Sequence, residues 1–274
     1  MRVKILQADT RPIHVAATSR NLSYGASNHF EIDTVLRENN GQLVFPQDTV
    51  TMGVLVNLVK CKAVGFEYEY YKGDPAKYII GHYLFTPNLN DPRRHCTWIK
   101  IDALTEAFAS EKNKGVDLFC MMDTDAWIRD ELAFKEALAT FLASDRVIAM
   151  PRDLDMPGST HLNSGLVIVK NTAEGKELIR QIHEDPAYAY YYQTGIVEQS
   201  ALNKLYEVNK EKWMVLPLAD FNTPCGRIIR HCWMKHINDM MIRDELHATF
   251  ARLCMSFVND TTYDIRSGLV LLRD

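Results

Sequence analysis

The sequence lacks a long apolar segment, paired cysteines and a strong excess of charge. Nowhere in its 274 residues does an apolar run reach the roughly 20 residues that a membrane-spanning helix needs. Met1 leads directly into the strand-like run Val3-Lys4-Ile5-Leu6, without the apolar core of a secretion signal. We therefore expect a cytoplasmic protein without a membrane span.

The 6 cysteines show no paired spacing, and no Cys-x-x-Cys pair occurs. This argues against a structural zinc site and against a disulfide framework. Cys120 lies inside an apolar run that we expect to be buried. The cysteines are therefore predicted to be free thiols in a reducing compartment.

The formal net charge is only -4, so the composition gives no reason to expect nucleic acid or an anionic membrane surface as a partner. Hydrophobic residues make up 47% of the chain and charged residues 24%, which is ordinary for a globular protein. No internal repeat and no change of composition marks a boundary. We expect a single large domain with a substantial core.

Strand-like and helix-like segments alternate along the chain, which favours an α/β fold with a mostly parallel sheet. Apolar runs predict strands at residues 2–9, 116–122, 146–150, 166–169 and 213–217, and a further short apolar run lies at 227–236. Alternating aromatic and charged residues predict another strand at 66–71. Helical spacing predicts helices at 49–64, 98–111, 130–143, 173–184, from 197 onward, and at 238–255.

The most informative stretch is the apolar run 116–122, which ends at Asp123-Thr124-Asp125. A run without alternation is typical of a strand that is buried on both faces of a parallel sheet. Open α/β sheets bind ligands at the carboxyl ends of their strands. Two carboxylates at such an end repel each other unless a cation lies between them. Because Mg²⁺ and Mn²⁺ accept carboxylate oxygens together with phosphates, the stretch predicts a metal–diphosphate site.

A structural alternative exists for these two carboxylates. Asp is a favoured residue at the start of a helix, and Asp130 and Glu131 suit a first helical turn. Asp125 could therefore cap the helix that follows rather than bind a metal.

Further motifs follow in a fixed order. They are Trp98-Ile99-Lys100, Met122-Asp123-Thr124-Asp125-Ala126-Trp127-Ile128, Leu162-Asn163-Ser164-Gly165, Glu198-Gln199-Ser200-Ala201-Leu202, and His231 with Lys235. On these motifs the chain resembles GT-A glycosyltransferases, and most closely family 34, the galactosyl- and xylosyltransferases that use a UDP-sugar and a divalent metal. The resemblance extends from Trp98 to the C-terminal helix and more faintly back to Asn57.

The resemblance implies a Rossmann-like GT-A fold, with residues 1–125 as the nucleotide-binding half and 126–274 as the donor-sugar and acceptor half. It implies transfer of a hexose or pentose (xylose, galactose or glucose) from a UDP-sugar to a hydroxyl of an oligosaccharide or a glycoprotein glycan. The expected cofactor is Mn²⁺ or Mg²⁺.

The resemblance also implies roles for particular residues. The metal ligands would be Asp123, Asp125 and His231. The donor-binding residues would be Lys100, Asp123, Thr124, Asp125, Asn163, Ser164, Gly165 and Lys235. Glu198 and Gln199 match a pair near the reacting centre. The segment between His231 and Lys235 is one residue shorter than the family pattern, which leaves His231 or His236 as the third ligand.

The family retains the anomeric configuration, which implies attack on the front face of the sugar. An inverting enzyme would instead need a carboxylate base beside the acceptor hydroxyl, for which Glu198 and Asp153 are both candidates.

Each of these residues also has an ordinary structural interpretation. Lys100 could be a helix surface residue, His231 a core histidine, Glu198 a first-turn acid, Asn163 part of a turn, and the tyrosines of 188–192 packing residues.

Two other functions remain open from sequence. A haloacid-dehalogenase-type phosphatase also places Asp-x-Asp after an apolar strand, with the first Asp as nucleophile. In this sequence Trp127 stands where that class carries Thr or Val, and the motif lies in the middle of the chain. The second alternative is a sugar-nucleotide binding protein without catalysis.

Overall fold

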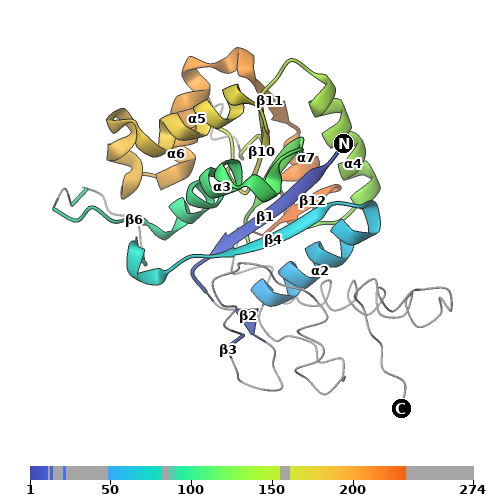
Figure 1. The fold of residues 1–274 in the computed structure, drawn as a ribbon, viewed down its shortest axis with the longest axis horizontal. Helices are drawn as coiled ribbons and strands as arrows, with labels where there is room; N and C mark the ends of the chain where they lie inside the picture. The colour runs from blue at the N-terminus through green and yellow to red at the C-terminus, as the bar shows by residue number, and fades with distance from the viewer. Residues whose placement is uncertain are drawn as a thin grey trace.

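The computed structural model describes residues 1–11, 13–14, 21–22, 49–81, 87–88, 90–154 and 161–232 (Figure 1). The strands are β1 (Val3–Asp9), β2 (Ile13–His14), β3 (Asn21–Leu22), β4 (Glu67–Lys72), β5 (Tyr78–Ile79), β6 (Arg94–His95), β7 (Leu118–Met122), β8 (Ala126–Ile128), β9 (Ile148–Pro151), β10 (Leu166–Lys170), β11 (Trp213–Leu216) and β12 (Ile229–His231).

The α-helices are α2 (Thr49–Val64), α3 (Ile99–Ala109), α4 (Glu131–Ala143), α5 (Ala173–Glu184), α6 (Val197–Val208) and α7 (Leu218–Phe221). Short 3-10 helices are η1 (Pro75–Lys77), η2 (Cys96–Trp98), η3 (Glu111–Asn113), η4 (Pro186–Tyr192) and η5 (Lys210–Lys212). Gly65 follows α2 with a φ of 77°, which is the left-handed conformation that the sequence predicts for a glycine at a helix end.

The central sheet has six strands in the order β11-β9-β10-β7-β1-β4. Pairs β1–β4, β1–β7 and β11–β9 are parallel, whereas β10 runs antiparallel to both β7 and β9. The predicted α/β fold with a mostly parallel sheet is therefore confirmed. A separate two-stranded sheet pairs β8 with β12.

The single reversed strand determines where the loops meet. The parallel strands β1 and β7 bring Asp9 and Asp123 to the same edge of the sheet. Because β10 runs the other way, its first residue, Leu166, pairs with Met122 at the end of β7. The loop before β10 therefore lies at the edge where β7, β9 and β11 end.

Two apolar clusters cover the two faces of the sheet, which explains why the run 116–122 shows no alternation. Leu118, Cys120 and Met122 pack in one cluster with residues of α2 and α4. Phe119 and Met121 pack in the other with α3, α5 and α6. Figure 1 shows these two groups of helices on opposite sides of β1 and β4.

The structure differs from the sequence predictions mainly at element ends and in short strands. The chain between β4 and α3 contains the parallel pair β5 and β6, which was not predicted, and Trp98 belongs to η2 rather than to α3. Of the run 227–236, the strand β12 covers only Ile229–His231. The predicted helix 238–255 lies outside the described residues.

The cysteines of the described segments are all free, as expected. Among the helices described here, none has the length and apolar character needed to cross a membrane.

Candidate metal centre

The Asp-x-Asp motif forms a tight turn between β7 and β8. The Asp123 amide donates to the Gly165 carbonyl at 2.9 Å, and the Ala126 amide donates back to the Asp123 carbonyl at 3.0 Å. The side-chain amide of Gln7, on β1, donates to the same Asp123 carbonyl at 2.7 Å and to the Ala126 carbonyl at 3.1 Å. The backbone of the turn is thus fixed from two neighbouring strands.

Two buried side-chain amides that hold this turn, those of Gln7 and Asn57, were not predicted from the sequence. Asn57 of α2 donates to the Ala126 carbonyl at 3.0 Å and accepts from the Ile128 amide at 2.8 Å. Tyr68 donates to the Gln7 side-chain oxygen at 2.7 Å, so that Gln7 is oriented as well. The sequence signal that could have identified them is a polar residue inside an apolar strand or helix face. Such a residue is buried, and a buried amide needs hydrogen-bond partners.

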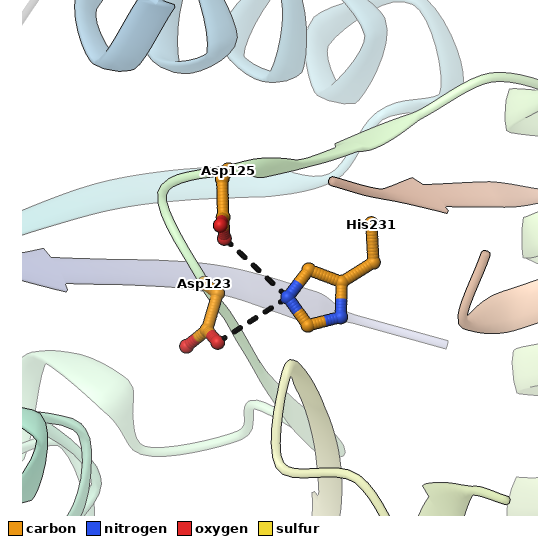
Figure 2. Close-up of side chains that lie close together, drawn as sticks. All are labelled: Asp123, Asp125 and His231. Carbon is orange, nitrogen blue, oxygen red and sulfur yellow. Dashed lines mark ion pairs between the residues drawn. The ribbon is translucent and has the colours of Figure 1, made fainter. Parts of the chain in front are cut away.

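His231 ends β12, which pairs with β8 in a register that places it opposite Ala126. Its Nε2 atom lies 3.5 Å from Asp123 Oδ2 and 3.4 Å from Asp125 Oδ1. Figure 2 shows this ring nitrogen facing both carboxylates. The three side chains each offer one ligand atom, all within 4.8 Å of one another. Two carboxylates and one imidazole in this arrangement could together hold a divalent metal ion.

Gly165 leaves the space that the imidazole fills. A Cβ built on Gly165 would lie 2.1 Å from the His231 Cε1 atom, far inside van der Waals contact. The glycine of the Leu162-Asn163-Ser164-Gly165 motif is therefore required by the close approach of His231.

The two carboxylates change the protonation of His231. Burial alone favours the neutral imidazole, but hydrogen bonds and charge from Asp123 and Asp125 outweigh burial and raise the pKa of His231 to about 9. Burial likewise opposes the charged form of Asp123, but Lys100 and His231 outweigh it and lower the pKa of that carboxyl. In the metal-free protein, His231 is thus a cation at neutral pH and balances part of the carboxylate charge.

Lys100 is buried, with a relative exposure of 6%. Its Nζ atom lies 2.7 Å from Asp123 Oδ1 and 2.6 Å from Glu198 Oε1. Burial opposes the charge of the ammonium group, but the two carboxylates outweigh it and raise the pKa of Lys100. The interpretation of Lys100 as a helix surface residue is wrong.

The remaining predicted residues extend this network toward β9. Ser164 donates from Oγ to Glu198 Oε1 at 2.9 Å and from its amide to Gln199 Oε1 at 3.1 Å. Gln199 in turn donates to Asp153 Oδ2 at 3.0 Å. Glu198 is 3% exposed, and its buried Oε2 atom has no hydrogen-bond partner within the described part of the chain. The first turn of α6 thus contributes a buried ion pair rather than a solvated acid.

Two of the predicted donor-binding residues make local hydrogen bonds, and a third is not described. The Thr124 hydroxyl donates to Asp9 Oδ2 at 3.0 Å. The Asn163 side chain accepts from the Gly165 amide at 2.8 Å and closes the turn. This agrees with the alternative that Asn163 is part of a turn. Lys235, like the alternative ligand His236, lies outside the described residues.

The capping interpretation of Asp125 is wrong. The residue that caps α4 is Asp130, whose side chain accepts from the Ala133 amide at 2.9 Å. Asp125 faces His231 instead.

The tyrosines of 188–192 behave largely as packing residues. Tyr188 is buried, the Tyr191 carbonyl accepts from the Trp98 indole at 3.0 Å, and the Tyr192 ring meets Trp98 edge to face.

No protein-family profile matches the chain, and a search of curated proteins finds no match. Solved structures of glycosyltransferases are similar to it in fold. A glycosyltransferase involved in glycosylation of the major capsid of PBCV-1 has 11% identity and a TM-score of 0.50, over 90% of this chain and all of that one. Mouse xyloside xylosyltransferase 1 has 9% identity and a TM-score of 0.45, over 89% of this chain and 93% of that one. The galactosyltransferase LgtC has 11% identity and a TM-score of 0.45, over 98% of this chain and all of that one.

The sheet order and the likeness to the capsid glycosyltransferase define the class: the chain has the GT-A fold. Identity this low identifies the fold alone, so the closer resemblance to family 34 stays a prediction.

Proposed function

We propose that the protein is a metal-dependent glycosyltransferase that moves a hexose or pentose from a UDP-sugar to a hydroxyl of a glycan acceptor. The observation that carries this proposal is the convergence of Asp123, Asp125 and His231 beside Lys100 at the carboxyl edge of β7. In open α/β folds, this edge is where ligands bind.

The charge arrangement suits the reaction. Cleavage of a bond between sugar and diphosphate develops negative charge on the departing phosphate. A divalent cation held by Asp123, Asp125 and His231 would supply Lewis-acid stabilisation of that charge. Lys100 adds a second, fixed positive charge within 2.7 Å of Asp123. The donor diphosphate is therefore proposed to lie beside the two Asp residues and Lys100.

The carboxylates near the reacting centre differ in how they are held. Glu198 is buried and paired with Lys100 at 2.6 Å. Asp153 is half-buried and accepts from Gln199 at 3.0 Å. The buried ion pair with Lys100 fixes the Glu198 side chain, which supports a role in positioning the sugar. Asp153 remains the candidate base if the enzyme inverts the anomeric centre.

A donor panel tests the proposal. The purified protein is incubated with UDP-glucose, UDP-galactose, UDP-xylose or a GDP-sugar, with Mn²⁺ or with EDTA, and release of the nucleoside diphosphate is measured. We expect Mn²⁺-dependent slow hydrolysis of one UDP-sugar, and an increase in Tm when Mn²⁺ and that donor are added together.

The same panel separates the alternatives. Turnover of p-nitrophenyl phosphate without thermal protection by any UDP-sugar would support a phosphatase and contradict the proposal. Protection by a UDP-sugar, with no hydrolysis and no transfer to any tested acceptor, would indicate a binding protein without catalysis.

A further inference from the structure

Asn222 is a buried residue that touches the candidate metal ligand His231 from the side opposite the carboxylates. It follows the short helix α7 and has a relative exposure of 0%. Its Oδ1 atom lies 2.7 Å from His231 Nδ1. The His231 amide also donates to the Thr223 carbonyl at 3.2 Å, so the backbone next to Asn222 holds β12 in the same position.

The hydrogen bond made by the Asn222 Nδ2 atom determines the orientation of its side-chain amide. Its Nδ2 atom donates to the Arg152 carbonyl at 3.0 Å. A carbonyl can only accept, so the NH₂ group faces Arg152 and the oxygen faces the imidazole. An amide oxygen also only accepts, and therefore His231 Nδ1 must carry a proton.

The proton on Nδ1 has a direct consequence for metal binding. Because Nδ1 is engaged by Asn222, the ring nitrogen placed to bind a metal ion is Nε2, the atom that faces Asp123 and Asp125. Hydrogen bonds to the far nitrogen of a metal-bound histidine fix its tautomer and ring orientation, and their loss typically costs about 10–100-fold in metal affinity.

We propose that Asn222 is a positioning residue, which holds the Nδ1 proton of His231 and so presents Nε2 to the divalent cation. This inference rests on the metal site of the proposed function. Through Arg152, the same amide connects the metal ligand to the end of β9, where the neighbouring Asp153 contacts Gln199.

The first test measures Mn²⁺ affinity by the EPR signal of free Mn²⁺ in three variants. Asn222→Leu removes the acceptor at similar volume, and we expect Mn²⁺ binding to weaken about 10–100-fold. Asn113→Leu is the matched control, because Asn113 is an equally buried amide in η3, before β7. It should lower stability and leave Mn²⁺ affinity unchanged. Asn222→Leu binding within about twofold of the unmodified protein contradicts the proposal.

The conservative variant Asn222→Asp separates positioning from a purely structural role. Aspartate keeps an acceptor for Nδ1–H but loses the donor to the Arg152 carbonyl. We expect Mn²⁺ affinity within about threefold of the unmodified protein, although stability falls. If Asn222→Asp loses as much affinity as Asn222→Leu, the contact with Arg152 is what matters and the proposal is wrong. This variant also serves if Asn222→Leu does not fold.

The second test needs no metal. In ¹⁵N-histidine-labelled, metal-free protein at neutral pH, we expect one downfield, slowly exchanging Nδ1–H resonance that disappears in His231→Gln. It should persist in Asn222→Asp and be lost or shifted upfield in Asn222→Leu or Asn222→Ala. An unchanged resonance in the last two variants overturns the proposal. If the unmodified protein binds no Mn²⁺, the proposed metal site fails, and this resonance still decides the role of Asn222.

Discussion

The two ends of the central strands each carry a cluster of buried charge, and the two clusters are built differently. At the amino ends of β1 and β4, the buried Lys4 lies 3.1 Å from Glu69 and 3.5 Å from Glu67. Lys112 lies 3.0 Å from Glu69. Burial raises the pKa of the Glu69 carboxyl, but Lys112 and Lys4 outweigh burial and lower it. Every carboxylate in this cluster, which we term the Lys4 cluster, has a cationic partner.

The cluster at the carboxyl ends keeps unused acceptors. Among the residues that the structure describes, Asp123, Asp125 and Glu198 share one lysine and one histidine, and Glu198 Oε2 has no hydrogen-bond partner. Asp125 is also 46% exposed at its side chain. A cluster that stabilises the fold satisfies its own charges, whereas this one has negative charge left for a cation from solution. Burial of charge alone therefore does not identify a site, but the balance of charge does.

The largest effect should come from Asp125→Ala. Loss of a metal ligand should reduce UDP-sugar turnover at least about a thousandfold, because the metal contributes several kcal/mol to stabilising the leaving group. The side chain is half exposed, so the free energy of unfolding should change by less than about 1 kcal/mol. Turnover and chemical denaturation measure the two effects.

Asp130→Ala is the control for this prediction. It removes the cap of α4 and should cost about 1 kcal/mol of stability with turnover unchanged. A large loss of stability in Asp125→Ala with retained turnover would show that Asp125 stabilises the fold and does not bind the metal.

The second prediction breaks the Lys4 cluster. Lys4→Met removes the ammonium group of a residue that is only 3% exposed and leaves Glu69 with one cationic partner fewer. We expect the free energy of unfolding to fall by about 3 kcal/mol, as for other broken buried ion pairs, with no change in Mn²⁺ affinity. Urea denaturation and Mn²⁺ EPR test this. A change in Mn²⁺ affinity would mean that the two ends of the sheet are coupled.

The third prediction concerns pH. Metal binding requires a neutral His231, whereas the carboxylates raise its pKa to about 9 in the metal-free protein. Mn²⁺ affinity should therefore increase about tenfold per pH unit from neutral pH up to about 9, and then level off. A flat affinity between these pH values would exclude His231 as a ligand, which leaves His236 to be tested by substitution.

The imidazole of His231 should give the stability of the metal-free protein a pH dependence opposite to that of Mn²⁺ affinity. The raised pKa of His231 means that the folded state binds the proton more tightly than the unfolded chain. This stabilisation is fully present below about pH 6.5 and is lost as the pH rises through about 9. The metal-free protein should thus become less stable over the range in which Mn²⁺ binds more tightly. His231→Gln should remove both dependences.

The smallest effect is expected for Thr124→Val. The Thr124 hydroxyl donates to Asp9 at 3.0 Å, so its loss should cost about 1 kcal/mol of stability. Mn²⁺ affinity should not change. A tenfold loss of Mn²⁺ affinity would place Thr124 in the metal site after all.

Much of the fold was predictable because its signals are local. The stretch 118–122 is apolar throughout because both of its faces are covered, and Gly65 follows α2 because the chain needs a positive φ there. Short strands such as β5, β6 and β8 were not predicted, because segments this short carry no periodic pattern and form only through pairing.

The candidate site was predictable in part. Most of the predicted site residues do come together in the structure: Lys100, Asp123, Asp125, Asp153, Ser164, Glu198, Gln199 and His231. Gln7, Asn57 and Asn222 were missed, because amides that satisfy a distant backbone group look in sequence like any other polar residue.

The sequence by itself determined the buried strand, its acidic end and the alternation of strands with helices, since each depends on residues that are neighbours in the chain. Only the tertiary structure decided that Asp125 faces His231 rather than capping α4, and that Lys100 is buried between Asp123 and Glu198. The physical reason is tertiary pairing. The pairing of β8 with β12 brings His231 beside Asp125, about 100 positions away in the chain, and the reversed direction of β10 brings the loop before it to the end of β7.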